Sequence, residues 1–147
     1  MTIIGIDPGS NGGIAWFSNG NVCVEKIPND LKDLYEILRD ISYNSHGNLE
    51  LVHCYLEKVH SSPQMGVVSA FSFGNGYGHI EMALTANRIP FEKVRPQTWM
   101  KDLDCMTKGD KNISKNKAQA MFPDIKVTHA IADALLIMSY GRKQQKQ

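Results

Sequence analysis

The sequence predicts a single α/β domain, in which a mixed sheet starts with antiparallel strands, continues with parallel strands and is flanked by helices. Three observations predict it: a run of short β-rich segments, a helical segment after them, and alternating strands and helices in the remainder. With 147 residues, 42% of them hydrophobic, the chain can bury one ordinary core without disulfides. We expect one domain over 1–141 and a basic polar tail over 142–147.

The first strands are predicted over 2–6, 12–17 and 22–27. The turn residues Asp7-Pro8-Gly9 end the first strand, and Ser18-Asn19-Gly20-Asn21 is a hairpin signal between the second and third. Pro28-Asn29-Asp30 then opens a helix whose apolar residues recur at helical spacing up to Ile41. A loop over 45–48 and a long buried strand over 49–59 follow.

The second half alternates between helices and one further strand. A helix is predicted over 66–87, and Pro90 precedes a strand over 91–95 that Pro96 closes. A basic loop, a helix over 114–121 and a final helix over 128–140 complete the domain. The core candidates around the first of these helices are Met65, Val68, Phe71, Ile80, Met82 and Leu84.

Charge is unevenly distributed, although the net charge is only +1. The segment from Lys93 to Lys117 holds seven basic and three acidic residues, and the tail adds Arg142, Lys143 and Lys146. The rest of the chain is therefore acidic. Basic segments attached to an otherwise acidic domain suit the binding of a polyanionic ligand. The alternative is that these basic residues only form a solvated surface loop and a polar tail.

The cysteines and the apolar segments indicate the cellular compartment in which the protein is expected. Cys23, Cys54 and Cys105 form no CxxC pair, and Met1 leads directly into a predicted strand without a leader. The longest apolar run near the C-terminus is interrupted by Asp133 and is too short for a membrane span. We expect a cytoplasmic protein with reduced thiols and no membrane partner.

Three acids lie in unusually apolar surroundings. Asp7 ends the first strand, Glu57 lies toward the end of the fourth, and Asp133 is embedded in the most apolar helix. A buried carboxylate costs several kcal/mol unless it is paired or binds a cation. Oxygen ligands of this kind suit Mg²⁺ or Mn²⁺ rather than zinc. Structural roles are the alternative: a turn cap for Asp7, an ion pair for Glu57 and a backbone contact for Asp133.

These residues carry a resemblance to a known family. The segment Ile4-Gly5-Ile6-Asp7-Pro8-Gly9, the later Glu57 and the helix Ala132-Asp133-Ala134-Leu135-Leu136 resemble the RuvC family of Holliday junction resolvases, above all its compact phage-type members. Val94 to Lys101 and Lys115 to Pro123 are similar to the family's strand, basic loop and pre-terminal helix in the same order. The resemblance implies an RNase H-like mixed five-stranded sheet.

The resemblance also implies an activity. A homodimer would make paired symmetric nicks in a four-way DNA junction and leave 5′-phosphate and 3′-hydroxyl ends. Two Mg²⁺ ions per active site, or Mn²⁺ as a substitute, would be held by Asp7, Glu57 and Asp133, and no nucleotide cofactor would be needed. If the protein is phage-encoded, it would act in the host cell cytoplasm.

The chain departs from the family pattern at one position. The family usually places an Asp or His three residues before its last Asp, where this chain has Ala130. His129, four residues before Asp133, lies on the same helical face and is expected to be a metal ligand or a general base, with a purely structural role as the alternative.

The DNA contacts are predicted as a group. The basic loop and the helix after it fall where the resemblance places contacts with DNA phosphates, and an aromatic wedge is expected at the centre of the junction, with core packing as the alternative for the aromatic residues. The predicted DNA-binding residues are Lys101, Lys108, Lys111, Lys115, Lys117, Phe73 and Tyr77.

Other functions remain open at this point. A related nuclease could act on other branched DNA or on an RNA–DNA hybrid. A sugar-kinase or actin-like ATP-binding domain shares the opening Gly-x-Asp-x-Gly, but it needs a second domain and a second phosphate loop. A non-catalytic junction-binding protein is the third alternative. Carboxylates that face DNA phosphates argue against it, because they would not help such a protein to bind DNA.

Overall fold

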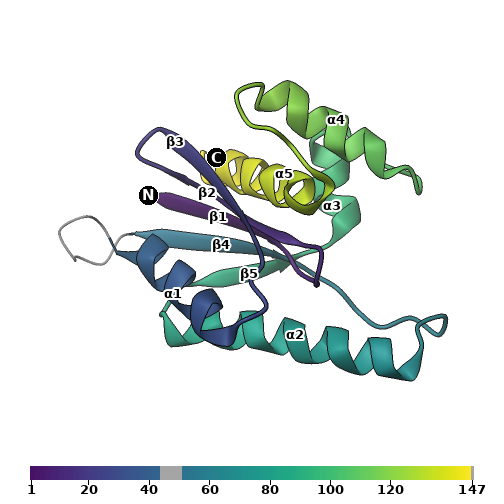
Figure 1. Ribbon diagram of the computed structural model, residues 1–147. Helices are drawn as coiled ribbons and strands as arrows, with labels where there is room; N and C mark the ends of the chain where they lie inside the picture. The colour runs from purple at the N-terminus through teal and green to yellow at the C-terminus, as the bar shows by residue number, and fades with distance from the viewer. Residues whose placement is uncertain (44–50, 147) are drawn as a thin grey trace.

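The computed structural model describes residues 1–43 and 51–146. Five strands form one mixed sheet in the order β3-β2-β1-β4-β5 (Figure 1). The first three form an antiparallel meander, and β4 and β5 extend it in parallel with β1, which confirms the predicted fold class. The strands are β1 (Thr2–Asp7), β2 (Gly13–Ser18), β3 (Asn21–Lys26), β4 (Val52–Glu57) and β5 (Phe91–Val94).

Helices cover both faces of the sheet, so the molecule has three layers (Figure 1). One face carries the first two helices and the other carries the last three. Because side chains alternate along a strand, β1 buries Ile4 and Ile6 under the first pair and Ile3 under the last helix. The helices are α1 (Leu31–Ser42), α2 (Val67–Ala86), α3 (Pro96–Asp102), α4 (Lys111–Met121) and α5 (His129–Gln144).

Helix α5 lies directly on β1 and β2 because glycines leave room for its backbone. A Cβ atom on Gly5 would lie 2.5 Å from the carbonyl oxygen of Ala134, and one on Gly13 would lie 2.5 Å from that of Ala130. No side chain fits in these gaps without displacing the helix. The two glycines therefore fix the depth at which the α5 residue Asp133 meets the end of β1.

Several element boundaries differ from those predicted. Residues 96–102 were expected to begin a loop, but Pro96 occupies the first turn of α3, where its missing N–H costs nothing. Helix α4 begins at Lys111 rather than at 114, because the Asp110 side chain caps it by accepting from the Asn112 N–H. The predicted loop over 45–48 and the first residues of the predicted strand over 49–59 lie outside the described residues, and β4 ends at Glu57.

The predicted polar tail is partly helical. Helix α5 continues to Gln144, beyond the expected end at 140. Arg142 stacks on the Phe17 ring, 3.6 Å from its centroid, and the Lys143 ammonium lies 3.0 Å from Asp102 Oδ2. These contacts hold the end of α5 against β2 and α3. None of the described helices combines the length and hydropathy needed to cross a membrane.

Helix α2 is less buried than its apolar sequence predicts. Ile80 and Leu84 belong to the core, but Val68, Phe71 and Met82, also expected there, are 83%, 78% and 61% exposed. Every buried residue of α2 lies in its C-terminal half, because the N-terminal half does not pack on the sheet. A large apolar surface is thus left uncovered along the first turns of the helix.

Candidate active site

The three predicted acids come together at one edge of the sheet. In the parallel pairing of β1 with β4, Ile6 lies opposite Leu56, so the next residues, Asp7 and Glu57, end neighbouring strands at the same edge. Asp133 reaches this edge from the second turn of α5, which packs across β1. Residues 7, 57 and 133 are far apart in the sequence but share one site.

The electrostatics show that the three carboxylates influence one another. Burial, and then repulsion from Glu57 and Asp133, raise the pKa of Asp7 from 3.8 to about 8, with Lys111 acting in the opposite direction. The pKa of Glu57 rises to about 7 through burial and the charge of Asp133. Burial also raises the pKa of Asp133, whereas Ser114, Lys111 and His129 lower it. A cluster with such raised pKa values favours a cation or a proton.

Glu57 is fixed in place by two neighbours. The fully buried Trp99 donates its indole N–H to Glu57 Oε2 at 2.9 Å, and this hydrogen bond lowers the pKa of the carboxyl group. The Tyr77 hydroxyl donates to the backbone carbonyl of Glu57 at 3.2 Å. Trp99 therefore anchors one of the two carboxylate oxygens of Glu57, a role that its place in the segment from Val94 to Lys101 did not predict.

A cavity of about 460 Å³ opens beside the acids. Asp7, Asp133, His129 and Lys111 line it, together with Lys26, which the sequence did not single out. The predicted hairpin could have indicated Lys26. Because β3 runs in the same direction as β1, Lys26 at the end of β3 pairs with Gly13 and reaches the sheet edge at which Asp7 ends β1. The cavity thus combines two carboxylates with cationic groups, a combination that suits a phosphate bound together with metal ions.

His129 is the first residue of α5 and is exposed at the mouth of this cavity. It lies near enough to Asp133 to lower the pKa of that carboxyl group. This placement is compatible with a metal ligand or with a proton carrier, so the choice between the two stays a prediction.

The three acids form a candidate metal centre. Within residues 1–43 and 51–146, no three His, Cys, Asp or Glu side chains are gathered closely enough to hold an ion as they stand. One observation nevertheless fits a cation: Asp133 Oδ1 is buried and has no hydrogen-bond partner in the described part of the chain. A buried acceptor without a partner is costly, and a divalent ion would satisfy it and relieve the repulsion among the acids.

The five predicted DNA-binding lysines are spread over two helices and the turn between them. Lys111, at the first turn of α4, lines the cavity and lowers the pKa of Asp7. Lys115 and Lys117 follow on α4, while Lys108 precedes it and Lys101 lies in the last turn of α3. All five are at least partly exposed, and of the five only Lys111 lines the described cavity.

The two predicted aromatic contacts, Phe73 and Tyr77, are both on α2. A Cβ atom on Gly9 would lie 3.4 Å from the Phe73 ring, so this ring borders the turn that follows Asp7. The ring of Tyr77 is covered by the Lys93 ammonium, 5.2 Å from its centroid. Both rings are partly buried next to the acids, and their contact with DNA stays a prediction.

Comparisons with known proteins agree with this architecture. No protein-family model matches the sequence, and no curated protein matches it. The structure of RuvC from Thermus thermophilus matches with a TM-score of 0.63 at 14% identity, over 99% of this chain and 97% of that one. T. thermophilus RuvC in complex with Holliday junction substrate matches with a TM-score of 0.64 at 15% identity, over 99% and 96%. The chain therefore has the RuvC-like, RNase H-like fold that its sequence resemblance implied.

Proposed function

We propose that the protein is a metal-dependent, structure-selective endonuclease that resolves four-way DNA junctions by paired symmetric nicks. The observation that carries this proposal is the convergence of Asp7, Glu57 and Asp133 at one sheet edge, with raised pKa values, in a fold shared with RuvC. A cationic segment beside these acids supplies the charge that a nucleic-acid backbone needs.

The residues of the chain have distinct roles in this proposal. Asp7, Glu57 and Asp133, with His129 as a fourth candidate, would hold two Mg²⁺ ions, which would supply an activated water and neutralise charge on the leaving 3′-oxygen. Trp99 orients Glu57 through its hydrogen bond. Lys111 provides a positive charge beside the scissile phosphate, and the more distant lysines hold the flanking DNA.

A cleavage assay tests the proposal directly. Synthetic four-way, flap, linear and RNA–DNA hybrid substrates are incubated with Mg²⁺, Mn²⁺ or EDTA. We expect symmetric nicks with ligatable ends in the four-way junction, and none in EDTA. Preferred cutting of flap or hybrid substrates would select the alternative nuclease functions, and binding without cutting would select a junction-binding protein.

Variants of the acids make the same test specific. Asp7→Asn, Glu57→Gln and Asp133→Asn should abolish cleavage and retain junction binding, because each removes a charge needed for the ions but no DNA contact. Asp124→Asn, an exposed acid in a turn before α5, is the matched control and should cleave normally. Normal nicking by the Asp7→Asn protein would contradict the proposed site.

A homodimer is part of the proposal, with α2 as its interface. The residues Val67, Phe71, Gly74, Gly78 and Met82 recur every three or four positions and are all exposed, which places them along one stripe. Cβ atoms on Gly74 and Gly78 would meet nothing within 4 Å, so packing within the chain does not require these glycines. Each costs about 1 kcal/mol relative to alanine in a helix.

The composition of α2 favours a second copy as the occupant of this stripe. Residues 66–80 contain no Asp, Glu, Lys or Arg, so two such helices can meet without charge repulsion, and the glycines allow close approach. A two-fold dimer also presents two equivalent sites to a junction with two-fold symmetry. Sedimentation should show a dimer for the wild type and a monomer for Phe71→Glu. Asn116→Glu, an exposed change on α4 on the opposite face of the sheet, is the control and should remain a dimer. A monomeric wild type at DNA-binding concentrations would refute the proposed interface.

A further inference from the structure

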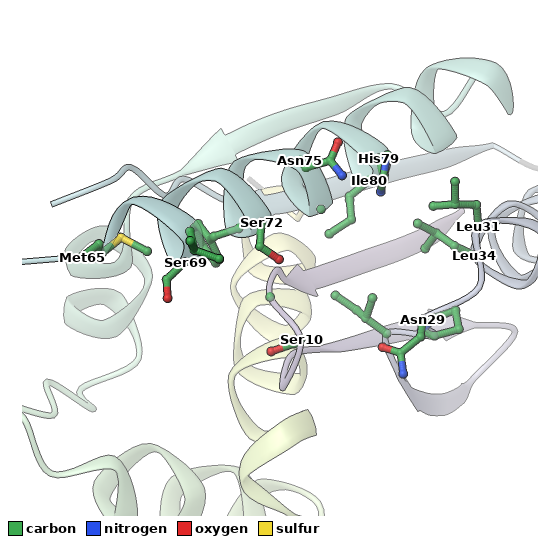
Figure 2. Close-up of a pocket in the computed structure, with 16 residues that line it drawn as sticks. Ser10, Asn29, Leu31, Leu34, Met65, Ser69, Ser72, Asn75, His79 and Ile80 are labelled. Carbon is green, nitrogen blue, oxygen red and sulfur yellow. The ribbon is translucent and has the colours of Figure 1, made fainter.

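The N-terminal half of helix α2, residues 67–78, receives little support from the rest of the chain. A cavity of about 640 Å³ separates it from the turn after β1 and the start of α1 (Figure 2). Ser69 and Ser72 of α2 lie on one side of this cavity, and Ser10 and Asn29 lie across it (Figure 2). The buried residues of α2 all come after this half of the helix. Little buried surface therefore stabilises it.

The sequence of this half of α2 also favours a helix only weakly. It contains Gly74, Gly76 and Gly78, and glycine is the least favourable helix residue after proline. A Cβ atom on any of the three would meet nothing within 4 Å, so packing within the chain does not require them. The helix begins after Gly66, which has no side chain to cap it. We expect this half of α2 to unfold locally at a lower cost than the core elements.

Tyr77 connects this half of α2 to the metal-binding acids. Its hydroxyl donates a hydrogen bond of 3.2 Å to the backbone carbonyl of Glu57, the last residue of β4. The next amide, that of Lys58, donates to the carbonyl of Val94 on β5 at 2.6 Å. The backbone at the end of β4 is thus held by β5 and by α2, whereas Trp99 holds one oxygen of the carboxylate. The placement of the Glu57 side chain therefore depends on α2.

The ring of Tyr77 is held in place by a charged pair. Lys93 on β5 places its ammonium group 5.2 Å from the centroid of the ring. The same ammonium group forms an ion pair with Glu81, which lies one helical turn after Tyr77 on the same face of α2. These contacts direct the hydroxyl toward the end of β4 for as long as α2 is helical at Tyr77.

We propose that Tyr77 is a positioning residue that ties the carboxylate of Glu57 to the helical state of α2. While this part of α2 is helical, its hydrogen bond fixes the end of β4, and Glu57 can act with Asp7 and Asp133 on a cation. When it unfolds, the bond is lost, and the apparent affinity for the cation falls with the fraction of molecules that remain helical. The inference rests on the proposed metal-dependent function and adds to it a link between α2 and the metal site.

The proposed dimer would supply the support that this half of α2 lacks. The exposed stripe that includes Phe71 belongs to the same half, so a second copy packed on it would stabilise the helix around Tyr77. A lone protomer would then bind ions weakly, and the two sites of a dimer would become competent together. This link would favour paired nicks over single ones.

Titration of the metal-free protein with Mg²⁺, followed by calorimetry without DNA, tests the role of the hydroxyl. Tyr77→Phe keeps the ring and removes the hydrogen bond, so we expect Mg²⁺ binding weakened by about fivefold. Its affinity for a four-way junction in EDTA should not change, because the ring and all the cationic side chains are retained. Tyr35→Phe makes the same change at an exposed tyrosine of α1 and should bind Mg²⁺ as the wild type does.

Gly76→Ala tests the dependence on the helix. Gly76 lies outside the exposed stripe, and alanine raises the helix propensity at a position where its Cβ meets nothing. The monomeric Phe71→Glu protein should bind Mg²⁺ several-fold more weakly than the wild-type dimer. Adding Gly76→Ala to it should restore Mg²⁺ affinity by up to about fivefold, but not when Tyr77→Phe is also present. Asn116→Ala, an exposed change on α4, raises helix propensity elsewhere and is the matched control, with no effect expected.

The outcomes separate this inference from the proposed function. A wild type that binds Mg²⁺ but nicks no DNA would refute the nuclease, while weaker Mg²⁺ binding by Tyr77→Phe would still support the link to Glu57. If the wild type nicks junctions and Tyr77→Phe binds Mg²⁺ equally well, only the inference is wrong. It is also wrong if Gly76→Ala leaves the monomer unchanged, or if its gain persists without the Tyr77 hydroxyl. A wild type that binds no Mg²⁺ would overturn both.

Discussion

Replacing Asp7 with asparagine should stabilise the metal-free protein, and the gain should grow with pH. Burial and the neighbouring acids raise the pKa of Asp7 in the folded state from 3.8 to about 8, so the folded protein holds this proton more tightly than the unfolded chain. Between these two pKa values the free energy of unfolding falls as pH rises. At about 1.4 kcal/mol per pKa unit, the loss reaches about 4 kcal/mol at pH 7 and stays under about 2 kcal/mol at pH 5. Asparagine has no proton to lose and avoids this cost.

Thermal unfolding in EDTA at pH 5 and pH 7 measures the effect. For a chain of this size, a few kcal/mol correspond to a Tm gain of about 10 °C for Asp7→Asn at pH 7, and less than half of that at pH 5. Mg²⁺ should raise the Tm of the wild type at pH 7 and leave that of Asp7→Asn nearly unchanged, since binding to the folded state stabilises it. Asp124→Asn is the control and should match the wild type. A lower Tm for Asp7→Asn than for the wild type at pH 7, or an equal gain at both pH values, would refute the reasoning.

Three further predictions concern the neighbours of the acids. Trp99→Phe keeps an aromatic ring at this buried position but removes the N–H donated to Glu57. Calorimetry should then show Mg²⁺ binding weakened by about tenfold, and the acid limb of the pH–rate profile should move to higher pH, because the hydrogen bond that is lost lowers the pKa of Glu57. Unchanged metal binding would mean that Trp99 only packs. His129→Ala should reduce the nicking rate more than the junction affinity, whereas a wild-type rate would leave only a structural role for it. The α4 lysines Lys111, Lys115 and Lys117 are replaced together by alanine. The slope of log K for junction binding against log salt concentration should become shallower by about two to three units. An unchanged slope would exclude this helix as a phosphate contact.

Local patterns in the amino-acid sequence are enough to predict the strands of the sheet and to single out the three acids. Alternating β-rich runs and turn residues such as Asp7-Pro8-Gly9 are local signals, and they predicted five strands in their order along the chain. The acids were also found locally, because a carboxylate at the end of an apolar strand, as at Glu57, or within an apolar helix, as at Asp133, is too costly to be incidental.

The neighbours of these acids, in contrast, follow from contacts between segments that are distant in the sequence. In the sequence Trp99 is only one residue of the segment from Val94 to Lys101, and tertiary packing brings its indole N–H within 2.9 Å of a carboxylate 42 positions away. Lys26 is likewise an ordinary polar end of a hairpin until the sheet places it beside the acids. The exposure of Phe71 depends on where the sheet stops supporting α2. A hydrophobic pattern shows that a side chain prefers to leave water, but the partner it meets is set by contacts between distant segments, which the pattern does not contain.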